Sequence, residues 1–464
     1  MGLGLNSGGL YTALHLASRG AELCITDLGD EKTLAPTIEQ LSHLPIRYVL
    51  GKHEMADFEW ADLVIKNPGV RPDSPFLKEA KAISTDISLF LDESPARILA
   101  VTGSKGKSSV SSALHWVLSE HHRGSIQSTQ ADKASYLGGN ITLSPLSFLD
   151  RLNPQDDVVL ELSSFQLGDL RGRNTLKPRG AIMTPIMRDH LDRYGTMESY
   201  IADKRLIYEN QDEGDLIVAQ SDRWGQSFID ESRARPLVYS DAPLEEGISG
   251  GWVQPSEGSR GPGLARLYGR GARTGQILEV VPPKPLVLGA HQKQNLLMAA
   301  LALLDLGLDS DFIRDSLGRF KGVEHRLEFF HQSGGMEFYN DSAATIPEAA
   351  AAALHAFEQP PVLVTGGTDK DLDFSPLARA ALLAKAVILL AGTGSQALSV
   401  LLEAQGIPYQ GPFDSLEGAI EAVEEAAAPG DPVVLSPGCA SFGMFTNEFY
   451  RGLQWKEKIR KHFP

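Results

Sequence analysis

The stretch Val101-Thr102-Gly103-Ser104-Lys105-Gly106-Lys107-Ser108 stands between an apolar segment, 97–101, and residues whose apolar side chains recur at helical spacing after Ser108. Phosphate oxygens need converging backbone N–H groups, glycines that let the backbone approach, a lysine, and a hydroxyl for magnesium. This stretch offers all four between a strand and a helix, although its glycines lie two residues closer together than in the general pattern. It therefore predicts a phosphate-binding loop.

The composition around this loop is that of an acidic globular protein. The chain has 464 residues, of which 42% are hydrophobic and 22% charged, and its net charge is −16. At roughly 100–200 residues per domain, a chain of this length should form about three domains. Long-range repulsion makes a uniformly acidic chain a poor partner for nucleic acid or for an anionic membrane surface. We therefore expect no nucleic-acid partner.

The sequence also bears on the compartment. Apolar stretches such as 296–304 fall far short of the ~20 residues that a membrane span needs. The first residues lack the basic region and apolar block of a signal peptide. The two cysteines, Cys24 and Cys439, cannot build a disulfide framework. These features favour a cytoplasmic protein with no membrane span.

Strands, glycine turns and helices alternate along the chain, which predicts an α/β protein with parallel sheets. We place its domains at 1–93, 94–322 and 323–464. No strand precedes the first glycines, Gly2 and Gly4, although a nucleotide-binding glycine loop usually follows one. Strand candidates are 22–27, 46–50, 63–66, 97–101, 158–162, 181–184, 336–339, 362–365, 387–390 and 433–435.

Two further segments carry local predictions. Nine glycines fall between Gly247 and Gly275, together with serines and arginines, which favours a mobile surface loop. Thr345 and Glu348 have the spacing of a capping box, with Pro347 in the first turn of an alanine-rich helix.

Polar residues follow other strand candidates. Glu161 ends one strand, Asp189 and His190 follow another, and Lys204 lies in a helical segment. A carboxylate and an imidazole at sheet ends near a phosphate loop could hold magnesium. The first glycine cluster, with Asp27 after it, has the look of a degenerate dinucleotide fingerprint. It indicates a bound nucleotide without specifying NAD.

Taken together, these segments resemble the Mur ligases of peptidoglycan synthesis, which are ATP-dependent amide-forming enzymes, and within them the glutamate-adding branch. The resemblance covers nearly the whole chain in order, and ELSSFQL at 161–167 is its most specific string. The other strings are GLGL near the start, Asn-Pro-Gly at 67–69, TGSKGKS, GGN ending at Asn140, DHLDRYGTMESYIADK ending at Lys204, HQKQN ending at Asn295, His325-Arg326, NDSAAT, GGTDKDLDFSPL and LSPGCASFGMF.

The resemblance implies a fold and a reaction. It implies an N-terminal Rossmann-like nucleotide-binding domain for a UDP-sugar, a central P-loop ATPase-like domain, and a doubly wound C-terminal α/β domain for the amino acid. The implied enzyme adds D-glutamate to UDP-N-acetylmuramoyl-L-alanine (UDP-MurNAc-L-Ala) through an acyl phosphate, with ATP and Mg²⁺. We expect it to be a monomer.

The resemblance also implies roles for single residues. Lys107 would contact the β- and γ-phosphates, and Lys204 would be carbamylated so that it can support magnesium. The implied ATP contacts are Gly103, Ser104, Lys105, Gly106, Lys107, Ser108, Ser109, Asn295, Arg326 and Asp341. The implied metal ligands are Ser108, Glu161, His190 and Lys204. The implied UDP-sugar contacts are Asn6, Ser7, Asp27, Asn67, Gly69 and Asn140, and the implied glutamate contacts are Thr345, Lys370, Ser441 and Phe442.

One position departs from the family pattern. The glutamate-adding branch usually reads NDSKAT, whereas Ala343 stands here in place of the lysine, so Lys370 becomes the main candidate for the amino acid's carboxylate. Lys105 stands where the family commonly has asparagine. D- and L-glutamate both stay open as substrates. The alternatives from other classes are a dinucleotide-binding oxidoreductase or sensor, folylpolyglutamate synthesis, and a catalytically inactive binding module.

Overall fold

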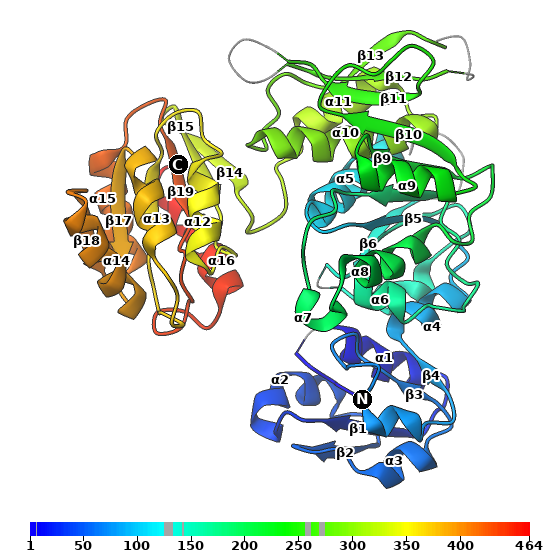
Figure 1. The fold of residues 1–464 in the computed structure, drawn as a ribbon. Helices are drawn as coiled ribbons and strands as arrows, with labels where there is room; N and C mark the ends of the chain where they lie inside the picture. Colours follow the sequence, from blue (N-terminus) through cyan, green and yellow to red (C-terminus); the bar gives the residue numbers. More distant parts are fainter. Residues whose placement is uncertain (6, 125–132, 142, 256–260, 269–273) are drawn as a thin grey trace. The chain divides into compact units, whose positions relative to one another are not determined.

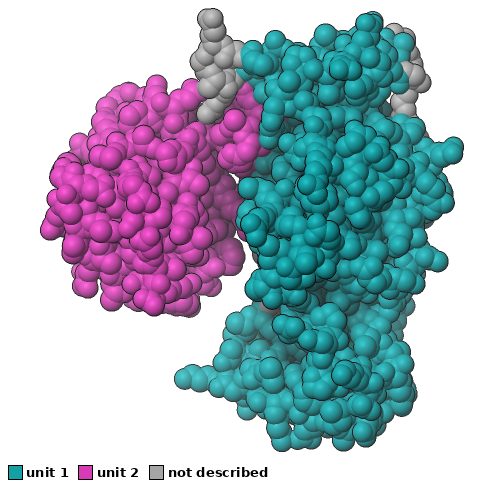
Figure 2. All heavy atoms as spheres, viewed as in Figure 1, with its two compact units in different colours: residues 1–255, 261–281, 294–316 teal, residues 256–260, 282–293, 317–464 magenta. Residues whose placement is uncertain are grey.

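The computed structural model describes residues 1–5, 7–124, 133–141, 143–255, 261–268 and 274–464. The chain divides into two compact units, which Figure 2 shows in different colours. The first unit comprises 1–255, 261–281 and 294–316, and the second comprises 256–260, 282–293 and 317–464. Figure 1 labels the helices and strands of both. No described helix is both long and apolar enough to cross a membrane.

The N-terminal part of the first unit contains two small parallel sheets, β1 with β2 and β3 with β4. Its elements are α1 (Ser7–Ser18), β1 (Leu23–Asp27), α2 (Glu31–Leu41), β2 (Ile46–Leu50), α3 (Met55–Trp60), β3 (Val64–Ile65), β4 (Ile83–Ser84) and α4 (Asp86–Glu93). As expected, the described residues before α1 form no strand. Instead the Gly2 N–H donates to Thr26 O (2.8 Å), and Met1 O accepts the Asn67 N–H (3.1 Å), so the first residues bridge β1 and the end of β3.

The rest of the first unit is built on a nine-stranded sheet with the order β13-β12-β11-β10-β9-β8-β5-β7-β6. The strands from β6 to β11 are parallel, and β12 and β13 continue the sheet antiparallel. They are β5 (Arg97–Thr102), β6 (Ser135–Gly139), β7 (Asp157–Glu161), β8 (Gly180–Met183), β9 (Leu216–Gln220), β10 (Arg235–Ser240), β11 (Gly250–Val253), β12 (Gly263–Arg266) and β13 (Ile277–Val281). The central strands are buried, as expected for a parallel sheet covered on both faces.

The helices of this region follow the strands that they connect. They are α5 (Lys107–Gly124), α6 (Ser164–Gly168), α7 (Leu191–Tyr194), α8 (Met197–Lys204), α9 (Arg223–Glu231), α10 (Ala290–Asp305) and α11 (Ser310–Gly318). The apolar face expected for α5 is confirmed, because Val110, Ala113, Leu114, Val117 and Leu118 are all fully buried. Helix α5 begins at Lys107, directly after β5 and the predicted loop.

The prediction of a mobile surface loop between Gly247 and Gly275 is wrong for its described part, which contains β11 and β12; 256–260 and 269–273 lie outside the described residues. Two of the described glycines, Gly250 and Gly263, allow close packing between strands. An added Cβ would lie 1.9 Å from Val238 O at Gly250 and 2.7 Å from Val281 Cβ at Gly263. At these two positions glycine reflects crowding between strands.

The second unit is a six-stranded sheet with the order β14-β15-β19-β16-β17-β18, parallel except for β14 with β15. Its strands are β14 (Glu328–Ser333), β15 (Met336–Asn340), β16 (Val362–Thr365), β17 (Ala386–Leu390), β18 (Gln410–Phe413) and β19 (Pro432–Leu435). Its helices are α12 (Pro347–Leu354), α13 (Ser375–Ala380), α14 (Thr393–Ala404), α15 (Leu416–Ala426) and α16 (Glu448–His462). Residues of α12, α13 and α14 pack in one core cluster and those of α15 and α16 in another, with alternate strand residues in each, so the sheet is covered on both faces.

The expected capping box at Thr345 is wrong. Pro347 is at the start of α12 as expected, but the N-cap residue is Ile346, and no side chain caps the helix. With Pro at the first helical position, one of the N–H groups that a cap would satisfy does not exist. Thr345 is thus half-buried in the segment before the helix and is not engaged as a cap.

Candidate active site

The predicted phosphate loop joins β5 to α5 in the conformation that only glycine tolerates easily. Gly103 has φ +142° and Gly106 has φ +91°. An added Cβ at Gly103 would lie 2.0 Å from Thr184 Oγ1, and one at Gly106 would lie 2.4 Å from Asn295 Oδ1. The structure therefore brings Asn295 of α10 against the loop.

Two lysines converge on the carbonyl oxygen of Gly103. Lys107 Nζ donates to Gly103 O and Ser104 O, both at 3.0 Å, and Lys204 Nζ donates to Gly103 O at 2.8 Å. Lys204 is only 1% exposed. Burial, and after it the charge of Lys107, lowers the pKa of Lys204 to about 7. The loop thus carries concentrated positive charge beneath the start of α5, where the helix dipole also favours an anion.

Glu161 lies at the end of β7, beside the loop strand, and is 2% exposed. Its Oε1 accepts a hydrogen bond from Asn140 Nδ2 (2.9 Å), whereas Oε2 is buried without a hydrogen-bond partner. A buried carboxylate oxygen without a partner is costly, and oxygen of this kind is the ligand that Mg²⁺ prefers. Glu161 therefore fits a magnesium ligand.

The other candidate ligands are less complete. His190 has a left-handed backbone (φ 52°), and its ring lies 4.9 Å from that of Phe165. Ser108 and Ser109 are half-buried in the first turn of α5, and Lys105 is exposed. No three His, Cys, Asp or Glu side chains form a ready-made metal cluster within the described residues. An ion at this site would depend on ligands such as the Ser108 hydroxyl and phosphate oxygens in addition to Glu161.

The described UDP-sugar candidates lie at the ends of helices and strands or in the loops beside them. Asp27 accepts the N–H groups of Gly4 (3.0 Å) and Gly29 (2.7 Å), and Asn67 Oδ1 accepts the Gly69 N–H (3.0 Å). Ser7 Oγ accepts the N–H of Ser144, and Asn140 reaches Glu161, so both contact the central sheet region. Asn6 lies outside the described residues.

In the second unit the structure brings Arg326 and Asp341 together. Asp341 Oδ1 accepts the Leu327 N–H (3.0 Å), and Oδ2 accepts a hydrogen bond from Ser436 Oγ (2.6 Å). Burial raises the pKa of Asp341 to about 7, while Ser436, the Leu327 N–H and the charge of Arg326 oppose the rise. Asp341 thus holds the turn 325–327, which carries Arg326, the other ATP candidate of this unit.

The glutamate candidates gather on two neighbouring loops of the same unit. Thr368 and Ala440 form a β-bridge, and the Thr368 hydroxyl donates to Phe442 O. Lys370 Nζ lies 5.9 Å from the centroid of the exposed Phe442 ring. Ser441 is buried on the same loop. The structure therefore groups Lys370, Ser441 and Phe442, whereas Thr345 lies on a different segment, just before α12.

Sequence reasoning missed the buried polar residues of α16. Arg451 is 1% exposed and donates to Ser342 Oγ, Ser342 O and Cys439 O. Lys456 pairs with Glu324 and Glu328. Basic residues in a terminal helix are usually solvated, so their residue types alone gave no signal. Arg451 is spaced by four residues from Trp455, and Trp455 by four from Ile459, and these two apolar residues are fully buried. This helical spacing was the signal that could have placed Arg451 on the buried face.

The strand, the glycine loop and the lysine that opens the helix define a nucleotide-binding protein of the phosphate-loop class. The chain belongs to the Mur ligase family. It matches the MurD-like N-terminal domain of Mur ligases over residues 1–88, the Mur ligase middle domain over 101–303, and the Mur ligase glutamate ligase domain over 325–439. Membership of a ligase family leaves the oxidoreductase alternative without support.

Similar proteins extend over nearly the whole chain. It is 38% identical to the UDP-N-acetylmuramoylalanine–D-glutamate ligase of Treponema pallidum, covering 99% of this chain and 96% of the relative. It is also 38% identical to the ligase of the same name from Roseiflexus sp., covering 97% and 96%. Among solved structures, UDP-N-acetylmuramate-alanine ligase from Thermotoga maritima has 21% identity and a TM-score of 0.56, covering 99% and 97%. MurF from Acinetobacter baumannii has 16% identity and a TM-score of 0.57, covering 95% and 92%. These two structures support the fold.

The crowding at Gly103 makes a stability prediction. Gly103→Ala should lower the free energy of unfolding by about 3 kcal/mol or more, because its Cβ would meet Thr184 Oγ1 at 2.0 Å. Gly172 is the matched control: its φ is +75°, but an added Cβ would meet nothing within 4 Å. Gly172→Ala should therefore lose only about 1–2 kcal/mol. Urea unfolding of both variants measures the difference, and equal losses would contradict this account of the loop.

Asp341 makes a prediction about pH. Its pKa in the folded protein, about 7, lies above the ordinary value of 3.8, so the folded state keeps a proton that the unfolded state loses. The wild type should therefore lose stability relative to Asp341→Asn as the pH rises from about 4 to about 7. Unfolding of both proteins at a series of pH values tests this. A difference that stays constant over that window would be incompatible with a raised pKa.

Proposed function

We propose that this chain is an ATP-dependent ligase that joins D-glutamate to UDP-MurNAc-L-Ala in peptidoglycan precursor synthesis. The observation that carries the proposal is the phosphate loop, where Lys107 and Lys204 converge on Gly103 beside the unpartnered oxygen of Glu161. Relatives that are 38% identical and bear the name of this D-glutamate ligase support the same substrates.

The reaction that we propose begins with the activation of a carboxylate. A carboxylate is a poor electrophile because its oxygen would have to leave as oxide. Attack of the UDP-sugar's terminal carboxylate on the γ-phosphorus breaks the bond to ADP and forms an acyl phosphate. The neutral amine of glutamate then attacks the acyl carbon, and collapse of the tetrahedral oxyanion releases phosphate and gives the amide. Lys107 and the N-terminus of α5 lower the repulsion between the reacting anions.

For magnesium we propose Ser108, Glu161, His190 and Lys204 as ligands. Magnesium bound there would supply charge neutralisation for the phosphates and polarise the phosphoryl group. A bare lysine ammonium among these ligands would repel a cation. The lowered pKa of Lys204 supports a neutral amine near pH 7, which can react with CO₂, lose a proton and form an anionic carbamate. We therefore propose that Lys204 is carbamylated.

The remaining assignments keep the expected three domains, 1–93, 94–322 and 323–464. We propose that the first holds the UDP-sugar through Ser7, Asp27, Asn67 and Gly69, with Asn140 from the central domain. The loop residues 103–109 with Asn295, Arg326 and Asp341 would bind ATP. Glutamate would bind at Thr345, Lys370, Ser441 and Phe442. We propose that the protein works as a cytoplasmic monomer.

L-Glutamate is the alternative substrate. Ala343 replaces the lysine that the branch usually carries, and its N–H donates to His325 O in the turn beside Asp341. The side chain therefore adds no positive charge near the amino acid, and the choice between the two enantiomers rests on the loops of Lys370 and Ser441. Assays with each enantiomer separate these alternatives.

Purified protein should release phosphate only when ATP, magnesium, UDP-MurNAc-L-Ala and glutamate are all present, with D-glutamate preferred. Lys107→Ala should lower turnover by about 100-fold or more because it removes charge stabilisation of the transferred phosphoryl group. Lys81→Ala is a matched control, since Lys81 forms an exposed pair with Asp62. Phosphate release that continues unchanged without the UDP-sugar would exclude the proposed reaction.

The carbamate makes a separate prediction. Lys204→Ala should lose most activity, and a short-chain carboxylic acid added to the assay should restore part of it by replacing the carbamate anion. Lys107→Ala should not respond to the same acid, because its missing group is a cation. A Lys204→Ala variant that no short-chain acid rescues, or an equal rescue of Lys107→Ala, would argue against carbamylation.

A further inference from the structure

The turn 325–327 holds an unusual backbone conformation. His325 has φ 63° and Leu327 has φ 45°, so two non-glycine residues on either side of Arg326 are left-handed. Such residues persist only where the surrounding structure holds them, and they gather at functional sites. The groups that hold this turn therefore determine where the backbone places Arg326.

Each backbone N–H of the turn has a defined acceptor. The Arg326 N–H donates to Val323 O (3.0 Å). The other two donate to carboxylates: His325 N–H to Glu328 Oε2 and Leu327 N–H to Asp341 Oδ1, both at 3.0 Å. The Glu328 carboxylate, which pairs with Lys456, is a charged acceptor, and a charged acceptor makes a stronger hydrogen bond to a backbone N–H than a neutral one does. Glu328 and Asp341 thus hold the two strained residues.

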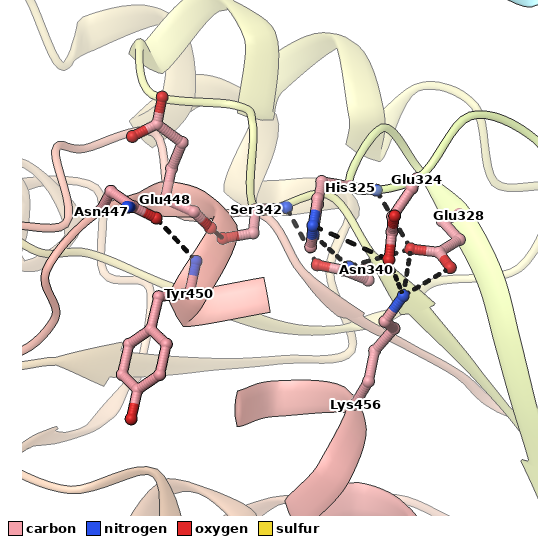
Figure 3. Close-up of polar contacts among 9 residues, drawn as sticks. All are labelled: Glu324, His325, Glu328, Asn340, Ser342, Asn447, Glu448, Tyr450 and Lys456. Atoms are coloured by element: carbon pink, nitrogen blue, oxygen red, sulfur yellow. Dashed lines mark hydrogen bonds and ion pairs between the residues drawn. The ribbon is translucent and has the colours of Figure 1, made fainter. Parts of the chain in front are cut away.

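Glu328 is itself fixed by two other elements. Its Oε2 accepts a second hydrogen bond, from Asn340 Nδ2 at the end of β15 (3.0 Å). Lys456, five residues after the buried Arg451 on α16, lies 2.9 Å from Glu328 Oε1 and 2.6 Å from Glu324 Oε1. Figure 3 shows Lys456 reaching from the helix to both carboxylates beside the turn. The side chains of Lys456 and Glu328 are only 10% and 14% exposed.

Asn340 connects the turn to the neighbouring segment. Its Nδ2 also lies 2.9 Å from His325 Nδ1, so that ring nitrogen accepts and the imidazole is neutral there. Burial lowers the pKa of His325, in agreement with a neutral ring. Asn340 Oδ1 accepts the Ser342 N–H (3.2 Å), and Ser342 Oγ donates to Glu448 O at the start of α16. The His325 side chain is therefore held by Asn340, and its backbone N–H is held by Glu328.

We propose that Glu328 is a positioning residue for ATP binding: with Lys456 behind it, its carboxylate holds the left-handed turn that presents Arg326 to the nucleotide. This inference rests on the proposed function, in which Arg326 contacts ATP. Glu328 makes these side-chain bonds to the turn and to Asn340, while its backbone pairs with Asn340 in the β14–β15 ladder. Loss of the carboxylate therefore releases the turn and leaves the ladder in place.

A double-mutant experiment on the full chain tests the functional part. Glu328→Ala should lower kcat/KM for ATP about 10-fold to 100-fold and leave the KM for the UDP-sugar unchanged. Glu328→Gln should recover most of this loss, because its amide oxygen still accepts the His325 N–H. Made in an Arg326→Ala background, Glu328→Ala should cause little further loss, because both changes remove one function. Glu417→Ala is the matched control, because Glu417 of α15 forms an exposed ion pair with Lys458, a residue of α16 like Lys456. Independent, multiplying losses in the Arg326→Ala background would overturn the proposal.

Hydrogen exchange without any substrate tests the structural part. In Glu328→Ala the amides of 323–328 should exchange about 10-fold faster or more than in the wild type, while peptides from β16 and β17 keep their rates. Glu417→Ala should leave all of these rates unchanged. If Glu328→Ala does not fold, Glu328→Leu with Lys456→Met replaces it: two apolar side chains then remove the acceptor and its cation together, and the same faster exchange is expected. Unchanged exchange at 323–328 would refute the proposal, whereas a wild type that releases no phosphate would refute the proposed function and leave this measurement decisive for the turn.

Discussion

The carbonyl oxygen of Gly103 holds the two lysine side chains of this site in place. It accepts Nζ of both Lys107 and Lys204, at 3.0 Å and 2.8 Å, so a neutral dipole holds two amines that would otherwise repel each other. This is possible because Gly103 has no Cβ, which would stand 2.0 Å from Thr184 Oγ1 and force β5 away from the end of β8. Lys204 lowers the remaining repulsion, since its pKa of about 7 lets it lose its proton near neutrality. The positions of Glu161, Asn140 and Asn295 all depend on the same strand ends staying close.

An acidic chain that binds anions must concentrate its positive charge. The net charge is −16, and the proposed substrates, ATP, a UDP-sugar and glutamate, are all anionic. The structure places lysines where water is excluded: Lys204, Lys66 and Lys456 are 1%, 4% and 8% exposed. A charge in such surroundings acts more strongly than one on the surface, because the local dielectric is low. Lys66 pairs with Asp169 and Lys456 pairs with two glutamates, whereas Lys204 and Lys107 both donate to Gly103 O in the predicted phosphate loop.

Local patterns in the sequence predicted the loop and ten of the strands β1–β19 closely, because a strand, a glycine turn and an amphipathic helix are each encoded by neighbouring residues. The strands 46–50 and 362–365 were predicted with the bounds that the structure gives. The sequence-based prediction failed where contacts between distant segments determine which residue type fits. Gly250 and Gly263 indicated a mobile loop from composition, but they are glycines because neighbouring strands leave no room for a Cβ. The turn of His325 and Leu327 could not be found either, since its acceptors, Glu328 and Asp341, become neighbours of those N–H groups only after folding.

Helix α16 gives a physical reason why Ala343 need not leave the amino-acid loops without positive charge. Arg451 is 1% exposed, and its acceptors are the neutral groups Ser342 Oγ, Ser342 O and Cys439 O; within the described residues no carboxylate forms an ion pair with it. Burial lowers the pKa of Arg451 to about 10, which still leaves the guanidinium charged at neutral pH. A buried charge without a counter-ion is costly, and an anion placed nearby relieves that cost. The nearby charge of Glu448 offsets part of this cost. Since Ser342 precedes Ala343 and Cys439 lies two residues before Ser441, the Arg451 guanidinium contacts the segments that lead into both loops with candidate glutamate contacts. Its positive charge favours an anionic amino acid there even though position 343 carries no lysine.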